Sequence, residues 1–159
     1  MEGPELEAVR RPLGHLLRLG ASRRVHARQA AAAGVDLTAP GALLLAALVE
    51  DGPRSLGDLA QATEMDPGAA SRQVKVLEAD GLVERRGRDG DARVQELRAT
   101  AAGKRVRARL ADVQHRHMAD VLATWSDEDR ERLAELLERF VDDLRSVAYR
   151  PGPDHRRTA

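Results

Sequence analysis

The chain has 159 residues, of which 42% are hydrophobic, 33% are charged and only 2% are aromatic, and its formal net charge is zero. So few aromatic residues mean that Leu, Val and Ala build the core, which favours packed helices over a sheet sandwich. The absence of cysteine excludes disulfides, thiolate catalysis, thiol redox sensing and Cys-ligated zinc.

No apolar run reaches about 18 residues, and the N-terminus is acidic without an apolar signal core. We therefore expect a soluble, cytoplasmic protein that has no membrane partner. No nucleophile with a paired base, metal-binding motif or phosphate-cradling glycine loop stands out, so we expect no enzyme activity.

The N-terminal third of the chain predicts two helices. Residues 1–11 are expected to be a weakly ordered arm that could start a helix. A helix is predicted from Pro12, because proline suits the first helical position, to about Ala33. Thr38 is a favourable N-cap for a second helix that runs to about Glu50. The second helix is apolar nearly all round and should be buried on most sides.

Residues 55–80 predict a helix-turn-helix. Ser55 caps a short helix that ends near Ala62. Asp66, followed by Pro67, caps another helix that runs to about Asp80, and Gly81 follows its end.

Two short strands, 82–86 and 92–97, are predicted next, joined by a Gly- and Asp-rich loop. A hairpin directly after the helix-turn-helix makes a winged helix. In a helix-turn-helix, the second helix lies in the major groove with its N-terminal residues at the base edges.

Two long helices are predicted in the C-terminal part, over 101–124 and after the Ser126 cap. The last helix carries an apolar stripe of Leu133, Leu136, Leu137, Phe140, Leu144 and Val147. Because a small central module could not cover such stripes, the sequence itself favours a dimer. Residues 151–159 form a polar tail.

Several motifs occur in an order and spacing that resemble the MarR family of transcriptional regulators. They are Leu37-Thr38-Ala39-Pro40, Ser55 to Ala60, Val74 to Arg85, Asp91-Ala92-Arg93 and Leu97 to Gly103, where Ala99 replaces a leucine of the family pattern. The resemblance covers roughly residues 12–148.

The resemblance implies a mainly α fold with a small β wing, in which a winged helix-turn-helix is flanked by long dimerisation helices. Residues 1–37 and 101–150 would form the helical dimerisation region, and 38–100 the DNA-binding module. Within it, the recognition helix spans about 66–80 and the wing about 83–98. The implied function is a ligand-responsive repressor that binds a pseudo-palindromic operator in double-stranded DNA as a homodimer.

The expected DNA contacts start on the recognition helix. Arg72 is the best base reader, because arginine pairs bidentately with guanine. Ser71 can reach a base or a phosphate, and Lys75 suits a phosphate. Gly68 and Ala69 permit close approach of the helix start to DNA.

Further contacts are expected outside that helix. Ser55, at a helix N-terminus, suits phosphate binding, and Arg86 and Arg88 are candidates for backbone contacts. By resemblance, Arg93 enters the minor groove, and Asp91 orients Arg93. Residues 54–98 carry eight basic and nine acidic residues, so DNA binding requires acidic side chains off the contact face. The alternative is a winged helix used for protein interaction or architecture.

Arg11, His15 and Arg18 recur at i, i+4 and i+7 and could form one wall of a site for a small anionic or phenolic effector. The simpler alternative is a solvated basic face. His115 and His117 point to different sides of a helix and cannot chelate together, so zinc is expected only if distant histidines meet. No other cofactor is expected.

Overall fold

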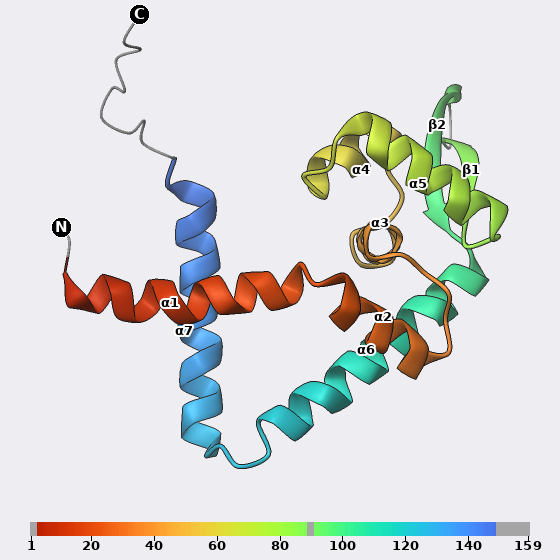
Figure 1. The fold of residues 1–159 in the computed structure, drawn as a ribbon. Helices are drawn as coiled ribbons and strands as arrows, with labels where there is room; N and C mark the ends of the chain where they lie inside the picture. Colours follow the sequence, from red (N-terminus) through yellow and green to blue (C-terminus); the bar gives the residue numbers. More distant parts are fainter. Residues whose placement is uncertain (1–2, 89–90, 149–159) are drawn as a thin grey trace, which may run out of the picture. The chain divides into compact units, whose positions relative to one another are not determined.

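The computed structural model describes residues 3–88 and 91–148, of which 88 and 91–94 by their backbone alone. Its elements are α1 (Pro4–Gly20), α2 (Arg23–Ala33), α3 (Ala39–Glu50), α4 (Leu56–Ala62), α5 (Pro67–Ala79), β1 (Val83–Arg88), β2 (Asp91–Ala99), α6 (Ala101–Val121) and α7 (Asp127–Ser146) (Figure 1). They divide into two compact units, Met1–Arg116 and His117–Ala159. The predicted polar tail lies outside the described residues.

The N-terminal helical region differs from the prediction. Helix α1 begins at Pro4, so Pro12 lies inside it. The predicted single helix to Ala33 is interrupted after Gly20, and a second helix, α2, begins at Arg23. The break arises because Ser22 adopts an extended backbone and its hydroxyl accepts a hydrogen bond from the Val25 amide, which starts a new helix. Gly34 ends α2 in the left-handed conformation, directly after the predicted end of the helix at about Ala33.

Helix α3 lies at the centre of the hydrophobic core. Leu44 and Leu45 are fully buried, and they pack in one cluster with Leu59 of α4, Leu77 of α5 and Leu97 of β2. The predicted burial of the apolar α3 is confirmed on most of its sides, although Leu43 remains 49% exposed. Helices α4 and α5 both contact α3, and this packing fixes the helix-turn-helix.

Local capping chemistry defines both helices of the helix-turn-helix. The Ser55 hydroxyl accepts from the Asp58 amide at 3.1 Å, and the Asp66 carboxylate accepts from the Ala69 amide at 2.9 Å. Gly81, with φ of +68°, follows α5 in the left-handed conformation that glycine adopts without strain. These three predictions are confirmed.

The wing is an antiparallel pair, β1 with β2, in which Val83 lies opposite Ala99 and the register shifts between Gly87 and Arg88. Strand β1 starts one residue later than predicted and runs two residues further towards the loop, and β2 is longer than predicted at both ends. Arg54, just before α4, forms backbone hydrogen bonds in both directions with Leu97, so the wing is anchored to the helix-turn-helix.

The last two helices bury little surface. Leu110 of α6 joins the core, and α6 ends at Val121, three residues before its predicted end. Helix α7 begins after the predicted Ser126 cap and contains no buried residue. None of the helices within the described residues is both long and apolar enough to cross a membrane.

Candidate nucleic-acid interface

Helix α5 presents two different faces. Ala70, Val74 and Leu77 are fully buried in the core. On the other side Arg72 and Lys75 are exposed to solvent, and Ser71 is half-buried. The structure therefore brings the predicted base reader and the predicted phosphate contact to one accessible face of the helix.

The start of α5 is built for close approach. Gly68 is exposed and Ala69 half-buried, so small side chains follow Pro67 in the first turn of the helix. A Cβ at Gly68 would lie 3.1 Å from Asp66 Oδ1 and 3.5 Å from Arg72 Nη1. The Arg72 guanidinium thus lies back towards Gly68 in the first turn of the helix.

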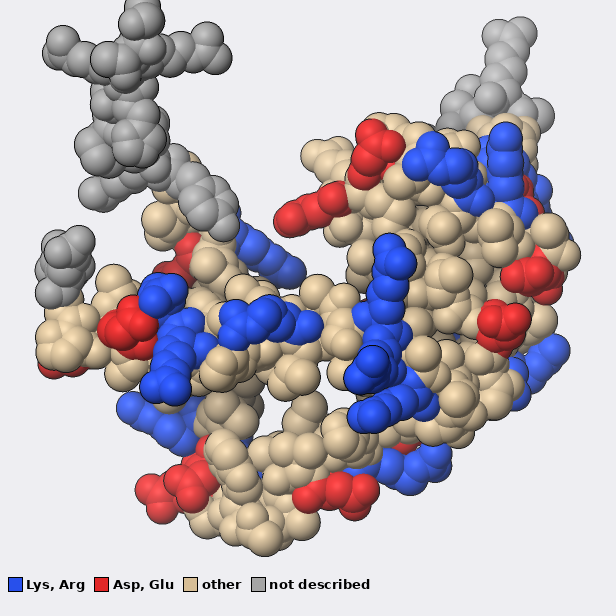
Figure 2. Space-filling view, viewed as in Figure 1, with Lys and Arg blue, Asp and Glu red and all other residues tan. Residues whose placement is uncertain are grey.

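The basic residues of the module differ in whether they are neutralised. In the part of residues 54–98 whose side chains the structure describes, Arg54, Arg85, Arg86 and Arg98 each form an ion pair with a nearby carboxylate. Arg72 and Lys75 form none in that same part. Figure 2 shows basic side chains beside the strands with acidic side chains around them, which fits this mixture of paired and unpaired charge.

Ion pairing also accounts for several of the acidic residues. Glu78 at the end of α5 accepts from Arg85 of β1 at 2.7 Å, and this pair joins the recognition helix to the wing. Glu84 pairs with Arg86 at 2.8 Å, although the Arg86 side chain remains 64% exposed. These carboxylates are held by neighbouring guanidinium groups, so Arg86 could reach a phosphate only in competition with Glu84.

The Ser55 hydroxyl is already engaged at the N-terminus of α4. It accepts from the Asp58 amide and donates to Asp58 Oδ2 at 2.7 Å. A phosphate at this helix start would have to replace that donation and lie beside the Asp58 carboxylate.

Three of the predicted wing contacts lie outside the described side chains. The backbone of Arg88 is in β1, and that of Asp91 and Arg93 in β2, at the ends of the strands that the connecting loop joins. The predicted roles of these three residues stay predictions.

Sequence reasoning missed two hydroxyl contacts to α5 and its end. Thr38 donates to Gln73 Oε1 at 2.8 Å, and Thr100 donates to the Gly81 carbonyl at 2.7 Å. Gln73 follows Arg72 in the sequence, yet its carbonyl oxygen faces the start of α3. The repeated pattern Thr-x-x-Gly at 38–41 and 100–103 was a signal that could have revealed the two contacts.

The predicted effector residues Arg11, His15 and Arg18 all lie exposed on α1. Two cavities exist elsewhere in the same unit. One of about 230 Å³ lies between α3 and α6, and one of about 270 Å³ is lined by the α2–α3 connection, the end of α5 and α6. Over the described residues, no group of three or more His, Asp or Glu side chains could hold a metal ion.

Comparisons with known proteins agree with this architecture. The model of the MarR family matches residues 35–94. An uncharacterised HTH-type transcriptional regulator of Bacillus subtilis, YxaD, is 36% identical over 106 residues, which are 63% of this chain and 73% of YxaD. A second such regulator, YdgJ, is 30% identical over 93 residues, 58% of this chain and 57% of YdgJ.

A solved structure shares the fold over most of the chain. A MarR family protein from Bacillus stearothermophilus superposes with a TM-score of 0.80 at 20% identity, covering 91% of this chain and 98% of that one. With the winged helix, its recognition helix and these relatives in agreement, the chain belongs to the MarR family of DNA-binding transcriptional regulators.

Proposed function

We propose that the protein is a homodimeric, sequence-specific transcriptional regulator that binds a two-fold symmetric operator and changes its DNA affinity when a small ligand binds. The observation that carries the proposal is the exposed face of α5. There Arg72 and Lys75 are accessible and free of ion pairs among the described side chains, while neighbouring arginines are neutralised.

This face has the chemistry of a DNA reader. Arg72 can donate two hydrogen bonds to guanine O6 and N7, which distinguishes guanine from the other bases in the major groove. Lys75 supplies a point charge for a phosphate, and Gly68 and Ala69 let the helix start approach the bases. Arg93, with Asp91 to orient it, would add a minor-groove contact from the wing, and Arg88 a contact to the DNA backbone.

The exposed apolar side chains of the outer helices, α1 and α7, support dimerisation with a second copy of the chain. Helices α1 and α7 bury no residue, and large apolar side chains on both are 41–65% exposed. Leaving two amphipathic helices open to water is unfavourable, and a two-fold dimer buries both sets at once. A two-fold dimer then presents two recognition helices to half-sites about one helical turn apart.

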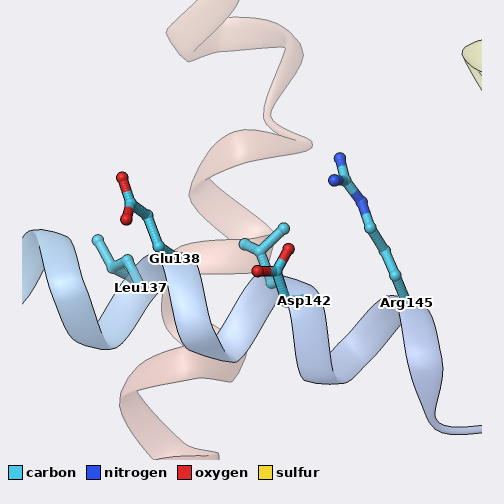
Figure 3. A pocket seen from close by; sticks show the side chains of 5 residues that line it. Leu137, Glu138, Asp142 and Arg145 are labelled. Atoms are coloured by element: carbon cyan, nitrogen blue, oxygen red, sulfur yellow. The ribbon is translucent and has the colours of Figure 1, made fainter.

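The opposite charges of the N-terminal helices and of α7 also support dimerisation with a second copy of the chain. Residues 4–33 carry six basic and two acidic residues, whereas α7 carries four basic and eight acidic residues. A hollow of about 480 Å³ along α7 is lined by Leu137, Glu138, Val141, Asp142 and Arg145 (Figure 3). Its two carboxylates and apolar walls suit a basic amphipathic helix, a description that the N-terminal helices of a second copy meet.

Ligand response is supported by the cavity between α3 and α6. Its walls are largely the apolar side chains Ala39, Ala42, Leu43, Ala46 and Leu110, with Arg107 and Gln114 as polar groups. Arg107 is already paired with Glu50 at 2.9 Å, so this cavity suits a ligand with a large apolar part. The basic face of Arg11, His15 and Arg18 remains our candidate for an anionic group. Loss of the effector response in a His15→Ala, Arg18→Ala variant would support that assignment, and an unchanged response would reject it.

Selection of genomic DNA fragments by the purified full chain tests the proposal. We expect enrichment of an inverted repeat that is bound by a dimer, with affinity that falls steeply as salt rises because Lys and Arg displace counterions from phosphates. Arg72→Ala and Arg93→Ala should each weaken binding to the selected sequence.

The opposite result is equally clear. If no sequence is enriched and binding stays weak at low salt, sequence-specific DNA reading is wrong and a role in protein interaction takes its place.

A further inference from the structure

Two threonines hold the recognition helix in the same manner from two different helices. Thr38 precedes α3 and Thr100 precedes α6, and each hydroxyl accepts a hydrogen bond at 3.1 Å from the amide three residues later, at Gly41 and Gly103. Each therefore caps its own helix. We call these two groups the threonine clamps: Thr38 with Gln73, and Thr100 with Gly81.

Each clamp uses its hydroxyl both as a donor and as an acceptor. A threonine hydroxyl has one proton to donate as well as lone pairs to accept. Thr38 donates its proton to Gln73 Oε1 in the middle of α5, and Thr100 donates to the carbonyl of Gly81 just beyond the end of α5. One hydroxyl thus fixes a helix start and ties that start to the recognition helix.

The glycines inside the clamps let the elements approach closely. Gly41 and Gly103 are both buried. A Cβ at Gly103 would collide with the Leu82 carbonyl oxygen and lie 3.1 Å from Leu45 Cδ1. A Cβ at Gly41 would lie 3.1 Å from Thr38 Oγ1 and 3.6 Å from Gln73 Oε1. The amide of Thr100 adds a hydrogen bond to the Leu82 carbonyl at 3.0 Å.

Among the described residues, the other hydroxyl N-caps, which are Ser22, Ser55 and Ser126, show no such link to α5. Ser55 donates to Asp58 and Ser126 donates to Asp129, in both cases within the first turn of the helix that the serine caps. Capping alone therefore does not require a bond to another element. The two threonines share the additional feature that their donated proton goes to α5 or to the turn that ends it.

We propose that Thr38 and Thr100 are positioning residues, which fix the orientation of α5 from its middle and its end and thereby sharpen discrimination between DNA sequences. The inference rests on the proposed DNA-reading function of α5. A bidentate arginine contact depends on geometry, so a small rotation of α5 weakens specific contacts while leaving attraction to phosphates largely intact.

The test compares two affinities for each variant at one salt concentration: for the selected inverted repeat, and for a scrambled duplex of equal length. Their ratio is the specificity. Thr38→Val and Thr100→Val keep the side-chain shape and lose the hydroxyl. We expect each to lower the specificity about 3- to 10-fold, the range of one lost hydrogen bond, and to leave affinity for the scrambled duplex within about twofold.

Three controls separate positioning from stability. Thr38→Ser and Thr100→Ser retain the hydroxyl and should restore the wild-type ratio. Ser126→Ala removes a hydroxyl cap that has no link to α5, so it should lower the free energy of unfolding without changing the ratio. Thr100→Asp keeps a good N-cap acceptor and has no proton to donate at neutral pH, so it should lower the ratio even if Thr100→Val does not fold.

Two outcomes would overturn the inference, and only the first of them leaves the proposed function standing. If the valine and aspartate variants keep the wild-type ratio while wild type prefers the inverted repeat, the threonines act on stability alone and the proposed function survives. If wild type itself shows no preference between the two duplexes, the proposed function and the clamps fail together.

Discussion

The winged-helix core and the outer helices α1 and α7 differ in how much of their apolar surface the chain itself buries. In the core, Leu44, Leu45, Leu59 and Leu77 are fully buried by neighbours from the same chain. Helices α1 and α7 also carry several large apolar side chains, yet no residue of either helix is buried. The difference teaches that one chain suffices to complete the DNA-reading module, whereas its outer helices require a surface that the described chain does not supply.

The largest expected effect is in the core. Leu45→Ala should lower the free energy of unfolding by about 2–5 kcal/mol, because it removes fully buried methyl groups and leaves a cavity. Leu43→Ala is the matched control on the same helix and should cost about 1 kcal/mol or less, since Leu43 is already 49% exposed. Denaturant unfolding at equal protein concentration measures both, and equal losses would contradict the assigned burial.

The next effect concerns the apolar stripe of α7. The double variant Leu136→Ala, Leu144→Ala should raise the dimer dissociation constant by about 100-fold or more, because a symmetric dimer loses each side chain twice. Sedimentation equilibrium measures the constant. The matched control Arg132→Ala, Arg139→Ala removes two exposed side chains of α7 that lie away from both the stripe and the hollow with Glu138 and Asp142, and it should change dissociation little. If both pairs behave alike, the stripe is not the dimer interface.

A smaller effect is expected on the DNA-reading face. Arg72→Ala should weaken binding to the selected operator by about 5- to 150-fold, corresponding to a lost bidentate base contact. Lys75→Ala should weaken all sequences alike and reduce the slope of log affinity against log salt by about one. Arg132→Ala on α7 is the control. Uniform weakening by Arg72→Ala across all sequences would make Arg72 a phosphate contact rather than a base reader.

The smallest effect is expected at the α7 cap. Ser126→Ala should destabilise the start of α7 by about 1 kcal/mol, because the Asp129 amide loses its acceptor. Thermal unfolding measures the loss, and DNA specificity should stay unchanged. A fall in specificity would show that α7 influences the winged helix more directly than its burial suggests.

Sequence analysis predicts the features that depend on local chemistry. The caps at Ser55, Asp66 and Ser126 follow from side-chain acceptors, and Gly81 from its tolerance of positive φ. The N-terminal break was not predictable in this way. The sequence predicts Pro12 at the first helical position that proline favours, but Pro12 lies within α1, and Pro4 holds the first position instead.

The site was predictable only in part, because contacts between elements are not encoded in local spacing. The equal number of charges gave no means of telling that Arg85 is paired with Glu78, seven residues away, while Arg72 is free of ion pairs in the described part of the module. Likewise, Gln73 is adjacent to Arg72 in sequence, yet its oxygen faces Thr38 of another segment. Such partners become visible only when α3, α5 and the wing are packed together.

The most direct test of the central claim is the mass of the full chain in solution, measured by sedimentation equilibrium with and without the selected operator. A winged helix complete in one chain and outer helices that need a second copy predict twice the chain mass of 17.3 kDa in free solution, and two chains on each inverted repeat. A stably folded monomer that binds the inverted repeat as a single chain would contradict this claim.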